Sequence, residues 1–111
     1  MKIAVSTNDG ISIDEHFGKA KTLTIYDVSD DGKILGIETI PGGANPDFSI
    51  SALEGAKYIL TAKIGPHWLR QLVGAGIASF DLQGEILPAI AKIVLHEKRQ
   101  RDRLAARNKD L

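Results

Sequence analysis

Histidine is the residue through which this chain could bind a metal or exchange protons near neutral pH, because it has three histidines and no cysteine. His16 stands in the sequence Ser-Ile-Asp-Glu-His-Phe-Gly, a turn-rich stretch. Asp14 and Glu15 precede it and could orient its ring or simply be solvated. Phe17 could fill the core or contact a ligand, and Gly18 would permit a close backbone approach. A loop that only reversed direction would need neither the histidine nor the phenylalanine, so we interpret it as a candidate binding loop.

A second candidate loop reads Ile-Gly-Pro-His-Trp and contains Gly65, Pro66 and His67. Proline suits the first position of a helix, and the free N–H groups of a helix N-terminus favour an anion. Gly65 would let that anion approach. His67 is either an exposed residue of the first turn or a contact to the anion, and Trp68 is either core or pocket wall. The third histidine, His96, lies far along the last predicted helix and is expected at the surface.

The elements that must position these loops follow from hydrophobic periodicity and turn residues. Asp31 and Gly32 predict a hairpin turn between two of the strands. The predicted order is β-β-β-α-β-α-β-α, which indicates an α/β fold with a mixed five-stranded sheet and helices packed on it. The strands are expected at 2–7, 22–28, 34–40, 57–62 and 77–81, and the helices at 47–54, from 66 to 73, and from about 84 onward.

The strands at 2–7 and 57–62 are each followed by one of the candidate loops. If these strands are adjacent and parallel, both loops emerge at the same edge of the sheet, where α/β proteins bind ligands. This topology would bring His16 and His67 to one site.

The composition indicates one domain, because 111 residues suffice for a single core. The charges are unevenly distributed along the chain, because residues 97–111 include six basic and three acidic residues. We expect a domain at 1–95 and a charged helical extension or tail at 96–111. No aromatic residue is interleaved with these charges, which disfavours nucleic-acid binding.

The start of the chain lacks the pattern of a signal peptide and no apolar stretch is long enough to span a membrane, so a cytoplasmic protein is expected.

Catalytic motifs are absent from the sequence, which disfavours an enzyme. It has no cysteine nucleophile, no phosphate-binding glycine loop and no two-histidine zinc motif. A nuclease would need metal-binding acids on the central strands. The strand at 2–7 contains no acidic residue.

Three groups of residues resemble the dinitrogenase iron–molybdenum cofactor biosynthesis family, which includes NifX, the core domain of NafY and the C-terminal domain of NifB. The first is Asp-Glu-His-Phe-Gly-Lys-Ala at 14–20 with Ile-Tyr-Asp-Val at 25–28. The second runs from 52 to 66 and ends in Ile-Gly-Pro, and the third covers 72–77 and 84–86. The resemblance extends over residues 1–95.

The resemblance implies a ribonuclease-H-like fold and a carrier rather than an enzyme. Its cargo would be the iron–molybdenum cofactor or an iron–sulfur precursor, and its partners would be cofactor-assembly proteins and apo-dinitrogenase. The family's cofactor-binding histidine corresponds to His16. Many members have a cysteine where this chain has His67, a less thiophilic ligand. The alternative is a regulatory module that binds a small anion or a protein partner and no cluster.

Overall fold

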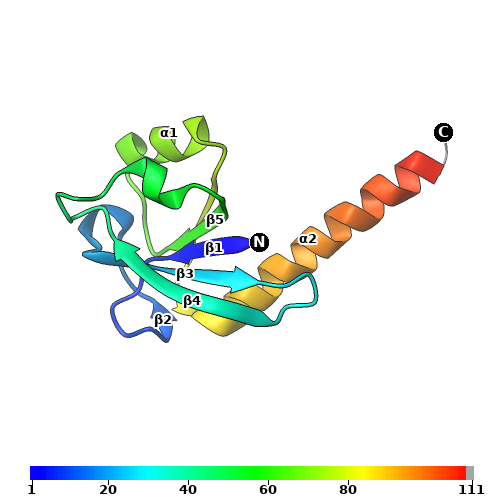
Figure 1. Cartoon of the computed structure of the whole chain (residues 1–111), viewed down its shortest axis with the longest axis horizontal. Coiled ribbons are helices and arrows are strands. Elements are labelled where there is room, and N and C mark those ends of the chain that lie inside the picture. Colours follow the sequence, from blue (N-terminus) through cyan, green and yellow to red (C-terminus); the bar gives the residue numbers. More distant parts are fainter. Residues whose placement is uncertain (110–111) are drawn as a thin grey trace.

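A mixed five-stranded sheet forms the centre of the molecule (Figure 1), and the computed structural model describes residues 1–109 of the chain. The strand order is β4-β3-β1-β5-β6. Strand β1 pairs antiparallel with β3 and parallel with β5, while β4 is antiparallel to β3 and β6 parallel to β5. The predicted mixed sheet is therefore confirmed. The bounds are β1 Lys2–Val5, β3 Thr22–Val28, β4 Ile34–Pro41, β5 Ala56–Thr61 and β6 Ala78–Asp81.

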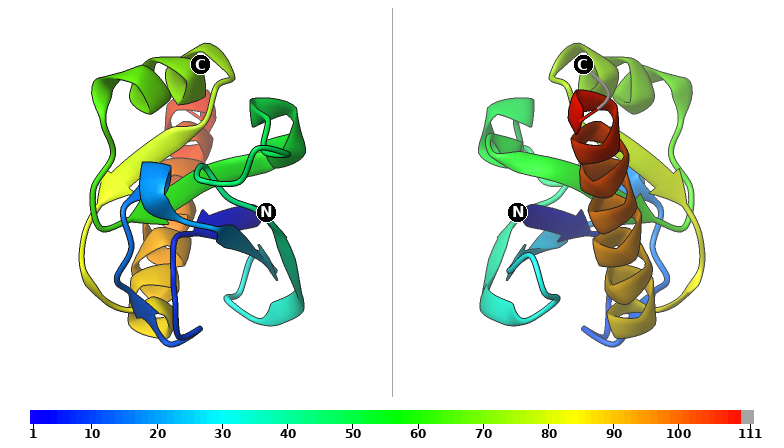
Figure 2. Two further views of the ribbon diagram at one scale, coloured as in Figure 1. Left: turned by 90° about the vertical axis from the view of Figure 1, so that its left-hand side faces the viewer. Right: turned by 90° about the vertical axis from the view of Figure 1, so that its right-hand side faces the viewer.

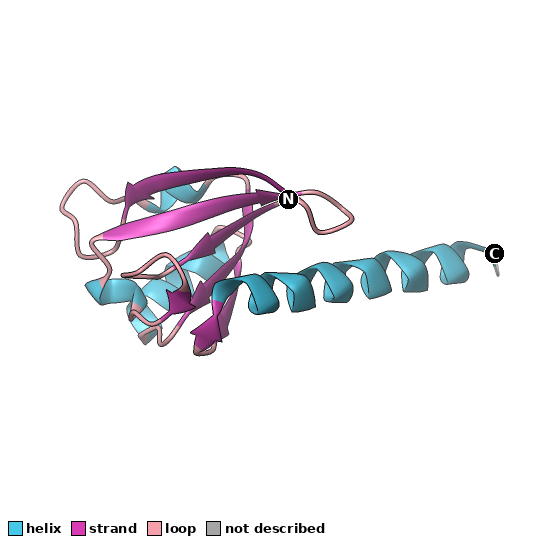
Figure 3. Ribbon diagram, turned by 90° about the horizontal axis from the view of Figure 1, so that it is seen from below, coloured by secondary structure: helices cyan, strands magenta, loops and turns pink. Residues whose placement is uncertain are grey.

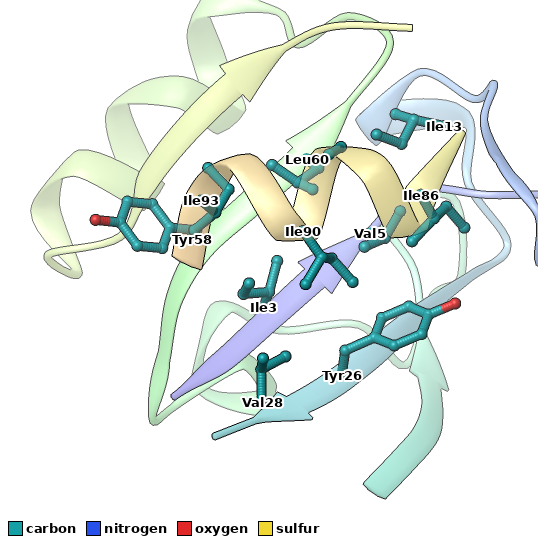
Figure 4. Close-up of a cluster of buried hydrophobic side chains, with 11 residues drawn as sticks. Ile3, Val5, Ile13, Tyr26, Val28, Tyr58, Leu60, Ile86, Ile90 and Ile93 are labelled. Carbon is teal, nitrogen blue, oxygen red and sulfur yellow. The ribbon is translucent and has the colours of Figure 1, made fainter. Parts of the chain in front are cut away.

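Helices cover both faces of this sheet (Figures 2 and 3). Helix α2 (Ile86–Lys109) lies on one face, and α1 (Pro66–Gly74) lies on the other with two 3₁₀ helices, η1 (Phe17–Lys19) and η2 (Ile50–Leu53). Both faces of β1 are covered, which explains its unbroken apolar run. In Figure 4 the side chains of Ile86, Ile90 and Ile93 point from α2 toward β1 and β5.

The helix predicted at 47–54 is wrong, because only the four residues Ile50–Leu53 form a 3₁₀ helix. The side chain of Asn45 accepts a 2.9 Å hydrogen bond from the backbone N–H of Asp47, which holds the preceding residues in a turn. Gly55 ends the segment with φ of +88°. The turn at Asn45 and the glycine at Gly55 thus limit the helical segment to four residues. The last helix likewise starts at Ile86 and not at 84, because Gly84–Glu85 form β7 and pair with β2 (Ser12–Ile13).

Glu97 attaches the middle of α2 to strand β5. Its carboxylate accepts a hydrogen bond from Tyr58 and a 2.6 Å bond from the Lys57 ammonium. These bonds, that from Lys57 above all, lower the pKa of Glu97, while burial and then the adjacent carboxylate raise the pKa of Tyr58 to about 12. Beyond Glu97, residues 98–107 are all exposed and the helix projects from the body (Figures 1 and 3).

The charged extension predicted at 96–111 thus begins inside α2, and its last two residues, Asp110 and Leu111, lie outside the described residues. Within residues 1–109 no helix is both long and apolar enough to cross a membrane.

Candidate functional site

The two candidate loops meet at the edge of the sheet where β1 and β5 end. Residues His16 and Lys63 form a parallel β-bridge between the loops. The backbone N–H of Phe17 donates to the Lys63 carbonyl at 2.9 Å, and that of Ala62 donates to the Glu15 carbonyl at 3.1 Å. Because β1 and β5 are adjacent and parallel, the predicted convergence of the two loops is confirmed.

Thr61, the last residue of β5, joins the same two loops through its side chain. It is fully buried, and its hydroxyl oxygen lies 3.1 Å from the carbonyl oxygens of both Glu15 and Lys63. Sequence reasoning missed this residue. Threonine is common in strands, so no signal distinguished it from an ordinary strand residue.

The backbone around His16 is fixed by the two acids that precede it. Glu15 accepts hydrogen bonds from the backbone N–H of His16 at 2.7 Å and from the Asn8 side-chain amide at 3.0 Å. These bonds, that from Asn8 first, lower the pKa of Glu15 and keep it ionised. Asp14 accepts a 2.9 Å bond from the backbone N–H of Asn8. Both acids therefore position the backbone of the loop that presents His16, which is itself half-buried.

Phe17 and Gly18 pack the loop onto helix α1. The Phe17 ring is fully buried and meets Phe48 and Trp68 edge to face, at centroid distances of 5.7 and 5.4 Å. A Cβ on Gly18 would lie 3.3 Å from Trp68 Nε1, so the close approach expected at this glycine is present. Phe17 is thus part of the core, and its packing holds the backbone of the neighbouring residue His16 in place.

Two further glycines hold the loop from its other side, and the sequence pattern did not single them out. A Cβ on Gly42 would lie 2.4 Å from the Ala20 carbonyl oxygen, and one on Gly43 would lie 2.6 Å from that of Phe17. Real Cβ atoms are never so close to a backbone oxygen. Two adjacent glycines soon after the strand predicted at 34–40 were the available signal, but the sequence does not show which backbone atoms they contact.

His67 lies in the first turn of α1, where it was predicted. It is exposed, and its ring meets Trp68 edge to face at 5.1 Å. Its Nε2 is 2.9 Å from the side-chain nitrogen of Gln71. An amide nitrogen can only donate, so the ring nitrogen is the acceptor in this contact. Gly65 is the N-cap residue and Pro66 the first helical residue. Trp68 thus contacts both loops, through Gly18 on one side and His67 on the other.

The donor set around these loops does not resemble a site for a bare metal ion. Across the described residues 1–109, no group of three or more His, Cys, Asp or Glu side chains is placed to hold one. His16 and His67 are single imidazoles. The same two loops carry the exposed cations Lys19 and Lys63 and the carboxylates of Asp14 and Glu15. The third histidine, His96, is exposed on α2, across the sheet from both loops.

These features define the chain as an α/β domain with a mixed five-stranded sheet and a histidine loop at the edge where its parallel strands end. Its sequence matches the model of the family described as "Dinitrogenase iron-molybdenum cofactor" over residues 1–95. The chain belongs to this family.

The relatives agree with this assignment. The FeMo cofactor biosynthesis protein NifB of Rhizobium meliloti is 38% identical over 91 residues, and that of Sinorhizobium fredii is 36% identical over 93 residues. These matches cover 74% and 76% of the chain and 19% of each relative, so the chain spans about a fifth of their length.

Solved structures confirm the fold. A Methanocaldococcus jannaschii protein proposed to be a dinitrogenase matches with a TM-score of 0.69 and 18% identity, covering 87% of this chain and 90% of that one. A Thermotoga protein proposed to be a NifB protein matches with a TM-score of 0.58 and 16% identity, covering 82% and 84%.

Proposed function

We propose that this domain carries an iron–molybdenum cofactor, or an iron–sulfur precursor of it, during cofactor assembly, and that it does so as a binding protein and not as an enzyme. The observation that supports this most directly is the bridge between His16, a half-buried residue, and Lys63, which stands two residues before Gly65, the N-cap of α1. Membership of the family relates the chain to this cofactor.

In the proposed complex His16 contributes one imidazole to an exposed metal of the cluster. The negative charge of the cluster is balanced by Lys19, Lys63 and the N-terminal end of α1. Gly65, Pro66 and His67 form the opposite wall, and His67 gives up its contact with Gln71 if it binds metal. One or two protein ligands suit a carrier, because the cargo must also be released.

The partners of such a carrier would be the assembly proteins that supply the cluster and the apo-dinitrogenase that receives it. The loop is well suited to hand over its cargo because Lys19, Lys63 and His67 are all exposed. The protein would act in the cytoplasm, where these proteins would be found.

An anaerobic titration of the apo-protein with isolated iron–molybdenum cofactor, followed by absorbance, tests the proposal. We expect saturable binding that weakens at least tenfold in His16→Ala, since one metal–ligand bond is lost, while circular dichroism remains unchanged. His96→Ala is the matched control, because this histidine lies on the other face of the sheet. Unaltered affinity in His16→Ala would exclude the ligand role.

A second candidate is a regulatory module that binds a small anion or a protein partner and no cluster. It is favoured by the missing thiolate and by the engagement of the His67 ring with Gln71. The same titration separates the two, because this module would leave the cofactor unbound and would bind inorganic phosphate or sulfate at the α1 N-terminus instead.

A further inference from the structure

Helix α2 is too narrow to cover its face of the sheet. Five strands about 4.8 Å apart span roughly 24 Å, whereas one helix is about 10 Å across. Among the described residues, the core under α2 takes side chains from β1, β2, β3 and β5 and none from β4, so the outer part of this face, over β4, is left open. Two clefts of about 610 and 400 Å³ lie there, and they share Ile34 and Leu87.

This open strip, which we name the β4–α2 groove, is apolar. Its large hydrophobic side chains are between 38% and 65% exposed. Exposed hydrophobic residues that are scattered singly over a surface are normal, whereas a contiguous patch of them marks an interaction site. The members are Ile11, Ile34, Ile37, Leu87 and Leu95, from three separate segments of the chain. A continuous surface of this kind indicates a partner.

The charges of the chain indicate which partner this is. Residues 98–107, the projecting part of α2, carry five basic side chains and one acidic one. Residues 1–97 carry eight basic and twelve acidic side chains. The body and the projecting helix therefore have opposite net charge. Arg101 pairs with Asp30 of its own body at 3.6 Å. The helix beyond it extends away from the body, where a second copy of the chain would supply an acidic surface (Figure 3).

We propose that two copies of this chain associate about a two-fold axis by packing their α2 helices antiparallel along the β4–α2 groove. Ala91 lies in the groove wall and offers a small residue at which the two helices cross. Antiparallel pairing about Ala91 places Leu87 of each copy opposite Leu95 of the other, because each is four residues from the crossing. It also brings Lys98 of each copy close to Glu85 of the other.

The same arrangement accounts for the projecting helix. Beyond Lys98, the basic segment of one copy passes the N-terminal end of the other copy's α2, where the strands Ser12–Ile13 and Gly84–Glu85 pair. That end carries Asp9 and Asp14 in addition to Glu85. Helical segments of this length are marginal without tertiary contacts, and packing against a second copy supplies them.

Sedimentation velocity of the full chain tests this proposal, which is independent of the cargo. The wild type should sediment as a dimer, and Leu87→Lys should sediment as a monomer with an unchanged circular dichroism spectrum. Val73→Lys is the matched control, because Val73 is a similarly exposed helical residue on the other face of the sheet and its substitution should leave the dimer intact.

The charge pair tests the register. Lys98→Glu and Glu85→Lys should each raise the dimer dissociation constant by roughly tenfold, since each puts like charges together. The double variant should return toward the wild-type constant. A monomeric wild type, a dimer that survives Leu87→Lys, or a double variant no better than the two single ones would each overturn the proposal.

Discussion

Replacing Thr61 by valine tests how firmly the His16 loop is attached to the turn before α1. Valine keeps the size and the β-branched shape of threonine and removes only the hydroxyl, which lies 3.1 Å from the carbonyl oxygens of Glu15 and Lys63. Each carbonyl retains a second donor, because Ala62 N–H reaches one at 3.1 Å and Phe17 N–H the other at 2.9 Å. No buried acceptor is therefore left without a partner.

The expected loss of unfolding free energy is about 1 kcal/mol, the net contribution of one hydrogen bond. Urea denaturation should show a lower midpoint with an unchanged slope, and the melting temperature should fall by roughly 4 °C. In nitrogen–proton correlation spectra, the amide signals of Phe17 and Ala62 should shift most. Thr39→Val, at an exposed position of β4, is the control and should change stability little.

Two outcomes would refute this reasoning. A loss below about 0.3 kcal/mol would show that the hydroxyl contributes nothing to joining the loops, whereas a loss above about 3 kcal/mol would show that the remaining donors do not satisfy the carbonyls. If cluster binding is also measured, Thr61→Val should weaken it less than His16→Ala, because it loosens the loop without removing the imidazole.

The other predictions concern Gly43 and Glu97. Gly43→Ala should destabilise the fold by about 1–3 kcal/mol in a urea titration, because its Cβ would lie 2.6 Å from a carbonyl oxygen, while Gly36→Ala, where a Cβ meets nothing within 4 Å, should be neutral. Glu97 has a lowered pKa in the folded state, so its contribution is complete above the ordinary carboxyl pKa of about 4.5 and is lost as the pH falls through the folded-state value. The difference in stability between wild type and Glu97→Gln should thus be largest near pH 7 and shrink in acid, and a difference independent of pH would contradict the assignment.

The fold could be predicted because it depends on patterns within single segments and on rules of connection. Strand β3 was predicted at 22–28 and is found at Thr22–Val28, since it is rich in β-branched and aromatic residues and a turn with a positive-φ glycine follows at Gly32. The parallel pairing of β5 with β6 followed from the helix that links them. The parallel pairing of β1 with β5 was the condition on which the two loops would meet, and the structure has it. The error at 47–54 arose where a turn formed by Asn45 competed with a weak helical pattern.

The candidate site could be predicted only in part. The residue types of His16 and His67 are unusual in loops, so the sequence marked both. Thr61 and Gly43 act on backbone carbonyls far away in the chain, and every residue has a carbonyl, so no residue type indicates such a contact in advance. Positions of this kind are found from the tertiary structure alone.

The contacts of Trp68 determine how the two loops depend on each other. Its ring lies against Phe17 and Phe48 and next to the backbone of Gly18, while His67 packs against it from the start of the same helix. A displacement of α1 would therefore move the wall against which the His16 loop packs, and the bridge between His16 and Lys63 joins that loop to the turn that precedes the helix. In the proposed carrier, such a connection would let a protein that receives the cargo loosen the hold of His16 by contacting the exposed first turn of α1.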